Sequence, residues 1–273
     1  MAIITISREL AALGDETAQE LAKLPGYRFV DKKALEERIK SYGIESRKFK
    51  RYDERKPSFL ASLSQDRDDY IHYLKTAIFA EAEQGSCVFI GRGAGVVFKN
   101  MPGVLSIFLV APLEIRLERV KSYFHCDEKR ARQIIERSDQ DRIGFHLYFF
   151  DIDWKDPGNY HLSFNTAVFT PSACAETIGR LRDYFFSPEA EARSAARLKE
   201  MVLSQQVKHH IIYERGIPIH FLETSFSGNT LTLYGVANSQ ALIEMALNAA
   251  REAADSAPVR SEIQIVREFN VIP

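Results

Sequence analysis

The feature that most constrains the fold is a series of short segments that are apolar at nearly every position, separated by stretches with helical periodicity. The first, residues 2–7, is rich in β-branched side chains. Strands that are apolar on both faces are typical of a parallel sheet covered by helices on each side. Strands are expected at 2–7, 27–30, 87–90, 105–110 and 161–164, and helices at 16–24, 32–42, 66–83, 113–123, 127–142 and 173–185. The sequence therefore predicts an α/β fold with a five-stranded parallel sheet and helices on both faces.

The pattern changes after residue 186. Residues 187–193 are the predicted linker, and a second, smaller α+β unit is expected over 194–273. Its elements are expected in the order helix, strand, strand, helix, strand, at 195–209, 217–224, 230–234, 239–254 and 262–268. A Ser-Gly-Asn sequence at 227–229 has the residues that a hairpin turn between the two adjacent strands requires.

Charge and composition exclude several classes of protein. The chain has 273 residues with 36 Lys and Arg against 37 Asp and Glu, so an overall positive field that binds nucleic acid is absent. No apolar run approaches the ~20 residues that span a bilayer. Cys87, Cys126 and Cys174 are too far apart for a disulfide framework or a metal cluster. We expect a cytoplasmic protein with no transmembrane segment, no metal site and no nucleic-acid partner.

The loop after the first strand is a candidate anion site. Ligands of parallel sheets lie beyond the carboxyl ends of the strands, where a loop and a helix N-terminus can bind a phosphate through backbone N–H groups. The candidate residues are Ser7, Arg8, Gly14, Glu16 and Thr17. The standard GxxxxGK[ST] motif is absent, because no Lys follows Gly14, and Asp15 and Glu16 occupy the start of the helix.

The residues inside this loop also weaken the motif. Cβ atoms on Ala11, Ala12 and Leu13 restrict positive φ angles, which phosphate-binding loops commonly use. Two interpretations stay open: a structural turn that begins the helix, or a working phosphate loop.

A second candidate is the turn Gly91-Arg92-Gly93, directly after a buried strand. The glycines allow a sharp backbone turn, and a guanidinium facing the crevice suits a phosphate or a carboxylate. The alternative is a turn whose arginine pairs with a local carboxylate.

A third candidate is a charged stretch with arginines at 116, 119, 130, 132, 137 and 142 and aspartates at 139 and 141. Arginine-rich helices can close over phosphates as a lid. The alternative is a solvated helix face with local ion pairs.

These segments together resemble the cytidylate-kinase-like family, a branch of the P-loop nucleoside monophosphate kinases. The matching residues are 4–8, 31–32, 88–94, 107–116, 119, 139, 142, 154, 156–157, 159–162 and 165–166. The resemblance covers roughly residues 1–186. It implies a P-loop NTPase-type fold, ATP as phosphoryl donor with Mg²⁺, and a pyrimidine monophosphate such as CMP as acceptor.

The resemblance also implies roles for particular residues. The acceptor-binding positions are Asp31, Gly91, Arg92 and Gly93, and the catalytic positions near the lid are Arg137, Asp139 and Arg142. The loop departs from the family pattern Ser-Arg-x-x-Gly-Ser-Gly-Gly-Arg-Glu, since Asp15 stands in place of a basic residue. A carboxylate there repels the phosphates that a cation attracts. We therefore expect phosphoryl transfer that is weak or lost on a retained fold.

The second unit resembles a BON domain, a module associated with phospholipid or protein surfaces. The resemblance rests on residues 227–239, a following helix, and a strand at 263–266. It implies a protein or phospholipid partner for residues 194–273. The alternative function is therefore a non-catalytic protein that senses a nucleoside monophosphate or other small anion, or that acts through this second domain.

Overall fold

The structure, a computed structural model, describes residues 2–42 and 66–266. The strongly basic stretch 47–56, which its lack of periodicity predicts to be an exposed loop, lies outside these residues. The chain divides into two compact units, residues 1–195 and 196–273, and each is described by itself. Among the described helices, none is both long enough and apolar enough to cross a membrane.

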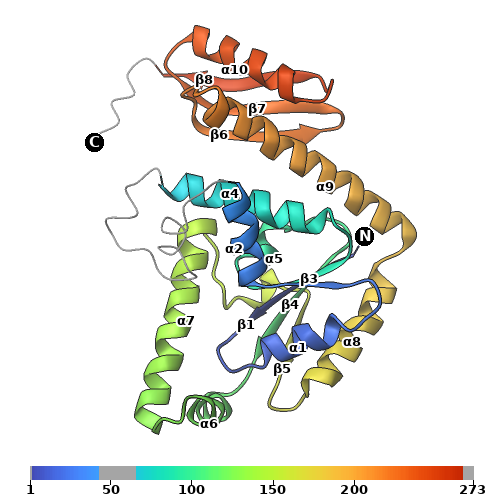
Figure 1. Ribbon diagram of the computed structural model, residues 1–273, viewed down its shortest axis with the longest axis vertical. Helices are drawn as coiled ribbons and strands as arrows, with labels where there is room; N and C mark the ends of the chain where they lie inside the picture. Colours follow the sequence, from blue (N-terminus) through green and yellow to red (C-terminus); the bar gives the residue numbers. More distant parts are fainter. Residues whose placement is uncertain (1, 43–65, 267–273) are drawn as a thin grey trace. The chain divides into compact units, whose positions relative to one another are not determined.

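The first unit is built on a parallel sheet, as the sequence predicts. Its five strands have the order β2-β3-β1-β4-β5, and every neighbouring pair is parallel. The strands are β1 (Ile3–Arg8), β2 (Arg28–Val30), β3 (Cys87–Ile90), β4 (Val104–Val110) and β5 (Leu162–Asn165). The central strands β1, β3 and β4 are almost wholly buried, because helices cover both faces of the sheet (Figure 1).

Each face of the sheet has its own core. Ile4 and Ile6 of β1 pack with α1 (Gly14–Leu21) and α8 (Pro171–Phe185), and Phe89 on the opposite face packs near Phe79 and Phe98. The helices of that opposite face are α2 (Lys32–Ser41), α4 (Asp66–Ala82), α5 (Ala94–Val97) and α7 (Glu128–Phe150). The remaining helix of this unit between β4 and α7 is α6 (Leu113–Phe124).

Helix α7 runs past the predicted end at residue 142. Phe145 and Phe149 are buried on one face of the added turns, so packing extends the helix beyond its charged part. It ends at Asp151, which adopts the left-handed conformation with φ 53°.

The second unit has the predicted element order. It contains β6 (His220–Ser227), β7 (Thr230–Ala237), α10 (Gln240–Ala253) and β8 (Val259–Ile265) after the end of α9 (Pro188–His209) and a π-helix, His210–Glu214. Strand β7 pairs antiparallel with β6 and parallel with β8. The predicted linker 187–193 is helical from Pro188 onward, because Ser187 accepts a hydrogen bond from the Ala190 N–H and proline suits the first helical position.

Candidate functional site

The loop between β1 and α1 keeps a left-handed backbone in spite of its side chains. Ala11 has φ 62° and Leu13, the residue before the helix, has φ 55°. Cβ atoms disfavour positive φ angles, and yet two of the three residues, Ala11 and Leu13, adopt them while Ala12 does not. Such a conformation costs an L-residue roughly 1–2 kcal/mol. Contacts elsewhere must hold the loop in this shape.

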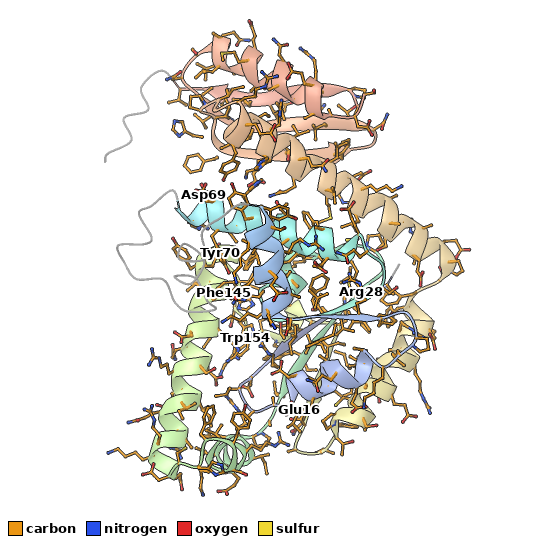
Figure 2. The ribbon with its side chains drawn as sticks, viewed as in Figure 1. Glu16, Arg28, Asp69, Tyr70, Phe145 and Trp154 are labelled. Atoms are coloured by element: carbon orange, nitrogen blue, oxygen red, sulfur yellow. The ribbon has the colours of Figure 1, made fainter. Side chains whose placement is uncertain are left out.

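The loop presents backbone donors at its helix end. Thr17 N donates to Leu13 O at 3.1 Å, which is the first bond of the helix. Among the described residues, the N–H groups of Gly14, Asp15 and Glu16 meet no protein acceptor. Free donors at a helix N-terminus attract anions. The Asp15 and Glu16 side chains are exposed and put negative charge at the same end (Figure 2).

The side chain of Arg8 lies directly over Gly14. A Cβ atom added to Gly14 would be 2.5 Å from Arg8 Cγ, so this position has no room for a side chain. The methylene groups of Arg8 therefore fill the space that a side chain at position 14 would occupy. The guanidinium belongs to the last residue of β1, at the carboxyl edge of the sheet.

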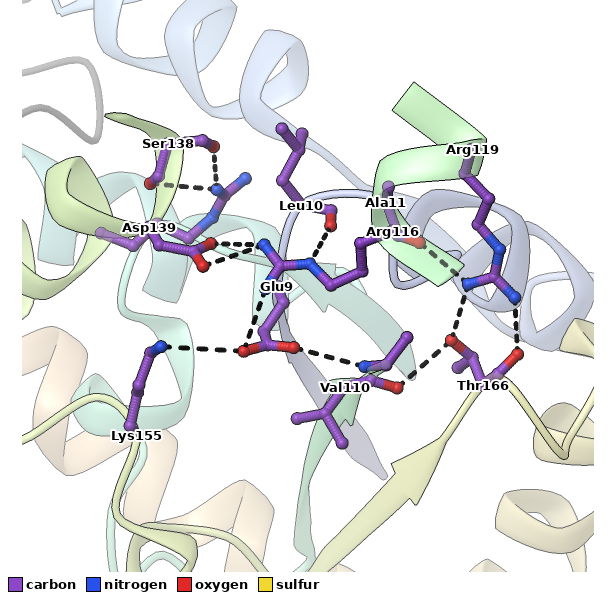
Figure 3. A network of polar contacts seen from close by, with 12 residues as sticks. Glu9, Leu10, Ala11, Val110, Arg116, Arg119, Ser138, Asp139, Lys155 and Thr166 are labelled. Atoms are coloured by element: carbon purple, nitrogen blue, oxygen red, sulfur yellow. Dashed lines mark hydrogen bonds and ion pairs between the residues drawn. The ribbon is translucent and has the colours of Figure 1, made fainter. Parts of the chain in front are cut away.

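A cluster of ion pairs around Arg116 stabilises the loop between β1 and α1 (Figure 3). Arg116 donates through Nε to the Leu10 carbonyl at 2.8 Å and through Nη2 to both carboxylate oxygens of Asp139, at 2.8 and 2.9 Å. Its Nη1 lies 3.3 Å from Glu9 Oε1, and Glu9 Oε2 accepts from the Ala111 N–H. Arg116 is only 4% exposed. Asp139 thus fixes the position of Arg116, and Arg116 in turn binds the Leu10 carbonyl of the loop.

Arg119 forms a second brace. Its guanidinium donates to the Ala11 carbonyl at 2.9 Å and to the Thr166 carbonyl at 2.6 Å. Burial lowers the pKa of Arg119, against the opposing effect of the Glu16 carboxylate. The carbonyl of the left-handed residue Ala11 is therefore fixed by a cation, which explains how the strained backbone persists. Protein oxygens bind both Arg116 and Arg119 in this structure, and the lid that the sequence suggests stays a prediction.

The turn after β3 is left-handed at three consecutive residues. Gly91, Arg92 and Gly93 have φ 69°, 56° and 69°. This backbone directs the Arg92 side chain inward, where it is 4% exposed. Arg92 Nη2 donates to Glu36 Oε1 at 3.2 Å, and Nη1 donates to the Tyr70 hydroxyl at 3.3 Å. Arg92 thus pairs with a carboxylate that is 56 residues away in the chain, and binding of a phosphate by Arg92 stays a prediction.

Other predicted residues have structural partners. Asp31 accepts from the Ala34 N–H at 2.8 Å and begins α2. Thr17 is fully buried and donates its hydroxyl to the Leu13 carbonyl at 2.7 Å. Arg142 donates to the Ser138 carbonyl one turn earlier in α7, and Arg137 is exposed on that helix. The structure thus brings Arg8, Gly14 and Arg92 to one edge and leaves Arg137 on the surface.

A small cavity with mixed polar and apolar lining lies beside the two turns. Its volume is about 10 Å³, room for one water molecule. Ser7, Gly93, His146 and Tyr160 are among the residues that line it. Burial raises the pKa of the Tyr160 phenol to about 12, so the hydroxyl stays protonated at neutral pH.

Glu9, Glu36 and Tyr70 contribute to these two turns but were not singled out by the sequence. Tyr70 counted only as an apolar position of its helix, and Glu36 as one of several charges on 32–42. The pairing of Glu36 with Arg92 spans 56 residues, and no periodic pattern reports such a contact. The i, i+4 spacing of Lys32 and Glu36 is the one local signal.

A five-stranded parallel sheet in the order β2-β3-β1-β4-β5, whose first strand leads through a loop into a helix N-terminus, is the arrangement of the P-loop NTPase-type α/β fold. The model of the cytidylate kinase-like family matches residues 3–168. The chain belongs to this family.

Two known proteins are similar to parts of the chain. The cytidylate kinase of Sulfolobus acidocaldarius is 38% identical over 96 residues, which are 35% of this chain and 52% of that protein. The chain therefore spans about half the length of this curated relative. An uncharacterised protein from Eubacterium ventriosum has a crystal structure with a TM-score of 0.52 and 21% identity, covering 67% of this chain and 99% of that one. This second likeness concerns the fold alone.

Proposed function

We propose that the first unit is a kinase-like nucleotide-binding domain, with ATP bound at the loop 8–16 and the phosphate of a pyrimidine monophosphate bound at Arg92. The observation that carries this proposal is the left-handed loop. Ala11 and Leu13 have positive φ angles, and arginines bind the carbonyls of Leu10 and Ala11, at a cost that a simple capping turn has no reason to bear. The strained shape leaves the helix N–H groups open to an anion.

Each charged residue has a distinct part in this proposal. Arg8 supplies the cation that the missing Lys would supply, from the strand end and not from the helix. Arg92 binds the acceptor's phosphate as a fork of donors. Asp139 is a positioning residue, because it acts through Arg116 and the Leu10 carbonyl.

Asp15 limits this chemistry. Its carboxylate stands beside the open helix N–H groups, and a like charge near the β- and γ-phosphates opposes binding. Phosphoryl transfer depends almost wholly on positioning and on charge stabilisation, so a repulsion there reduces the rate as well as the affinity. We therefore propose slow transfer from ATP to CMP.

Mg²⁺ enters this proposal with ATP. Among residues 2–42 and 66–266, no group of three His, Cys, Asp or Glu side chains is placed to hold a metal. The hydroxyl of Thr17 is buried and donates to Leu13 O, so it is not aimed at the loop's open side. The residues present do not fit a resident ion, and the metal's chemistry is that of the ATP–Mg²⁺ complex.

The test is ADP formation from ATP–Mg²⁺ with CMP or dCMP at high enzyme concentration. We expect slow turnover that needs both substrates and that falls at least tenfold in Arg92→Lys, because Lys cannot make a bidentate contact. Arg132→Lys, on the surface of α7, is the matched control. Binding of CMP without any turnover would favour the non-catalytic sensing protein, and binding of neither nucleotide would overturn the proposal.

A further inference from the structure

Arg92 is bound by a carboxylate on the guanidinium where the proposed function places the acceptor's phosphate. Glu36 Oε1 lies 3.2 Å from Arg92 Nη2, and the Arg92 side chain is 5% exposed. A carboxylate beside a buried guanidinium offsets part of the cost of burying that charge. An acceptor phosphate would offset it in the same way.

Tyr70 and Glu36, two of the partners of Arg92, differ in how firmly they are fixed. Tyr70 is 3% exposed, and its ring packs on Phe149 with centroids 4.9 Å apart and edge-on to Phe145 at 6.4 Å. Figure 2 shows Tyr70 and Phe145 close together between α4 and α7. The Glu36 side chain is 36% exposed on α2. Glu36 is therefore the partner that can leave, while Tyr70 keeps the guanidinium in place.

Glu36 has another partner on its own helix. Lys32 Nζ lies 3.8 Å from the same Glu36 Oε1, one helical turn earlier. The start of α2 is fixed by Asp31, which caps it through the Ala34 N–H. A displaced Glu36 carboxylate can thus pair with Lys32 by a side-chain rotation, with the helix unmoved.

We propose that Glu36 is an internal competitor for the acceptor's phosphate, which holds Arg92 until a phosphate replaces it and so sets the affinity of the acceptor site. This inference rests on the proposed function of Arg92. It predicts that displacing Glu36 costs free energy for every ligand whose phosphate binds Arg92. A ligand without a phosphate does not displace Glu36 and has no such cost. The ATP loop lies outside this contact and keeps its affinity.

The experiment is calorimetric titration of the full chain with CMP, cytidine and ATP–Mg²⁺ in a buffer free of phosphate and sulfate. The variants are Glu36→Gln, which removes the charge, and Glu36→Ala, which also removes the hydrogen bond. Glu37→Gln is the matched control, because Glu37 is an exposed neighbour on α2 that pairs with Lys33 at 3.9 Å. Thermal unfolding of each variant shows whether it is folded.

We expect Glu36→Gln to bind CMP about fivefold more tightly than wild type, because CMP then displaces an uncharged amide and not a carboxylate from Arg92; fivefold corresponds to about 1 kcal/mol. Glu36→Ala should gain at least as much, and Glu37→Gln should match wild type. Cytidine and ATP–Mg²⁺ should show no change. The same CMP affinity in wild type and both Glu36 variants would overturn the competitor while leaving the acceptor site intact. Absence of CMP binding in all variants would overturn the acceptor site itself.

Discussion

The loop after β1 and the turn after β3 both adopt a left-handed backbone, but they do so with different residue types. Both run through the left-handed region at the carboxyl edge of one sheet. The turn uses Gly91 and Gly93, which adopt positive φ readily, whereas the loop uses Ala11 and Leu13, which do not. The loop alone has two arginine braces on its carbonyls. A strained backbone thus depends on distant contacts, and a glycine-rich one depends on its own flexibility.

The largest effect should come from removing the brace under the loop. Arg116→Met leaves the buried Asp139 carboxylate without its cation and leaves Glu9 with Lys155, 3.8 Å away, as its remaining cation, and breaking such a cluster costs about 3–5 kcal/mol. Trp154 is the chain's only tryptophan and is 1% exposed in the first unit, so its fluorescence during urea unfolding reports this unit alone. Arg132→Met, which removes only a surface pair with Glu128, should unfold as wild type does. Equal urea midpoints for Arg116→Met and Arg132→Met would show that the contacts of Arg116 do not stabilise the first unit.

Next in size is the glycine turn itself. Gly93→Ala combines a φ of 69° with a Cβ atom 2.6 Å from Phe150 Cζ, so we expect a loss of roughly 2–3 kcal/mol in unfolding free energy. Gly26→Ala is the control, since it has φ 81° but nothing within 4 Å of the added atom, and it should lose about 1 kcal/mol. The same tryptophan signal measures both. A Gly93→Ala protein as stable as Gly26→Ala would mean that Phe150 moves aside freely.

A smaller effect of opposite sign should follow from relieving strain in the loop. Ala11→Gly removes the left-handed penalty and should stabilise the first unit by about 0.5–1 kcal/mol. The neighbouring Ala12 is fully buried and has no positive φ, so Ala12→Gly should destabilise it by about 1 kcal/mol. If the two substitutions changed the urea midpoint in the same direction, the strain at Ala11 would not be real.

The sequence predicted the architecture well because the signal is local and repeated. Residues 87–90 are apolar at every position, and β3 has the predicted bounds. Helix α7 was predicted too short, although Phe145 and Phe149 continue its buried face at the four-residue spacing of a helix. Expectations drawn from single residues in isolation were weaker, as the positive φ of Leu13 shows.

The sequence predicted where the residues of the candidate site lie in the fold better than it predicted which residues they contact. Arg8, Gly14 and Arg92 do lie at the carboxyl edge, as strand order requires. The partners of Arg92 and of Arg116 come from segments far along the chain, and charge alone does not say which carboxylate an arginine meets. The prediction that Asp15 opposes a bound triphosphate is the one that only binding data can test.

The most direct test of the whole account is therefore the affinity for ATP–Mg²⁺ of Asp15→Asn beside wild type, measured by calorimetry at fixed salt. Asp15 is exposed, so the substitution leaves the fold alone and changes one charge at the helix end. Glu244→Gln, an exposed position of α10 in the second unit, is the control and should bind as wild type does. If the loop keeps the backbone conformation that binds a phosphate and only the Asp15 charge opposes it, Asp15→Asn should bind ATP–Mg²⁺ about threefold to tenfold more tightly than wild type. Unchanged or weaker binding would contradict that claim.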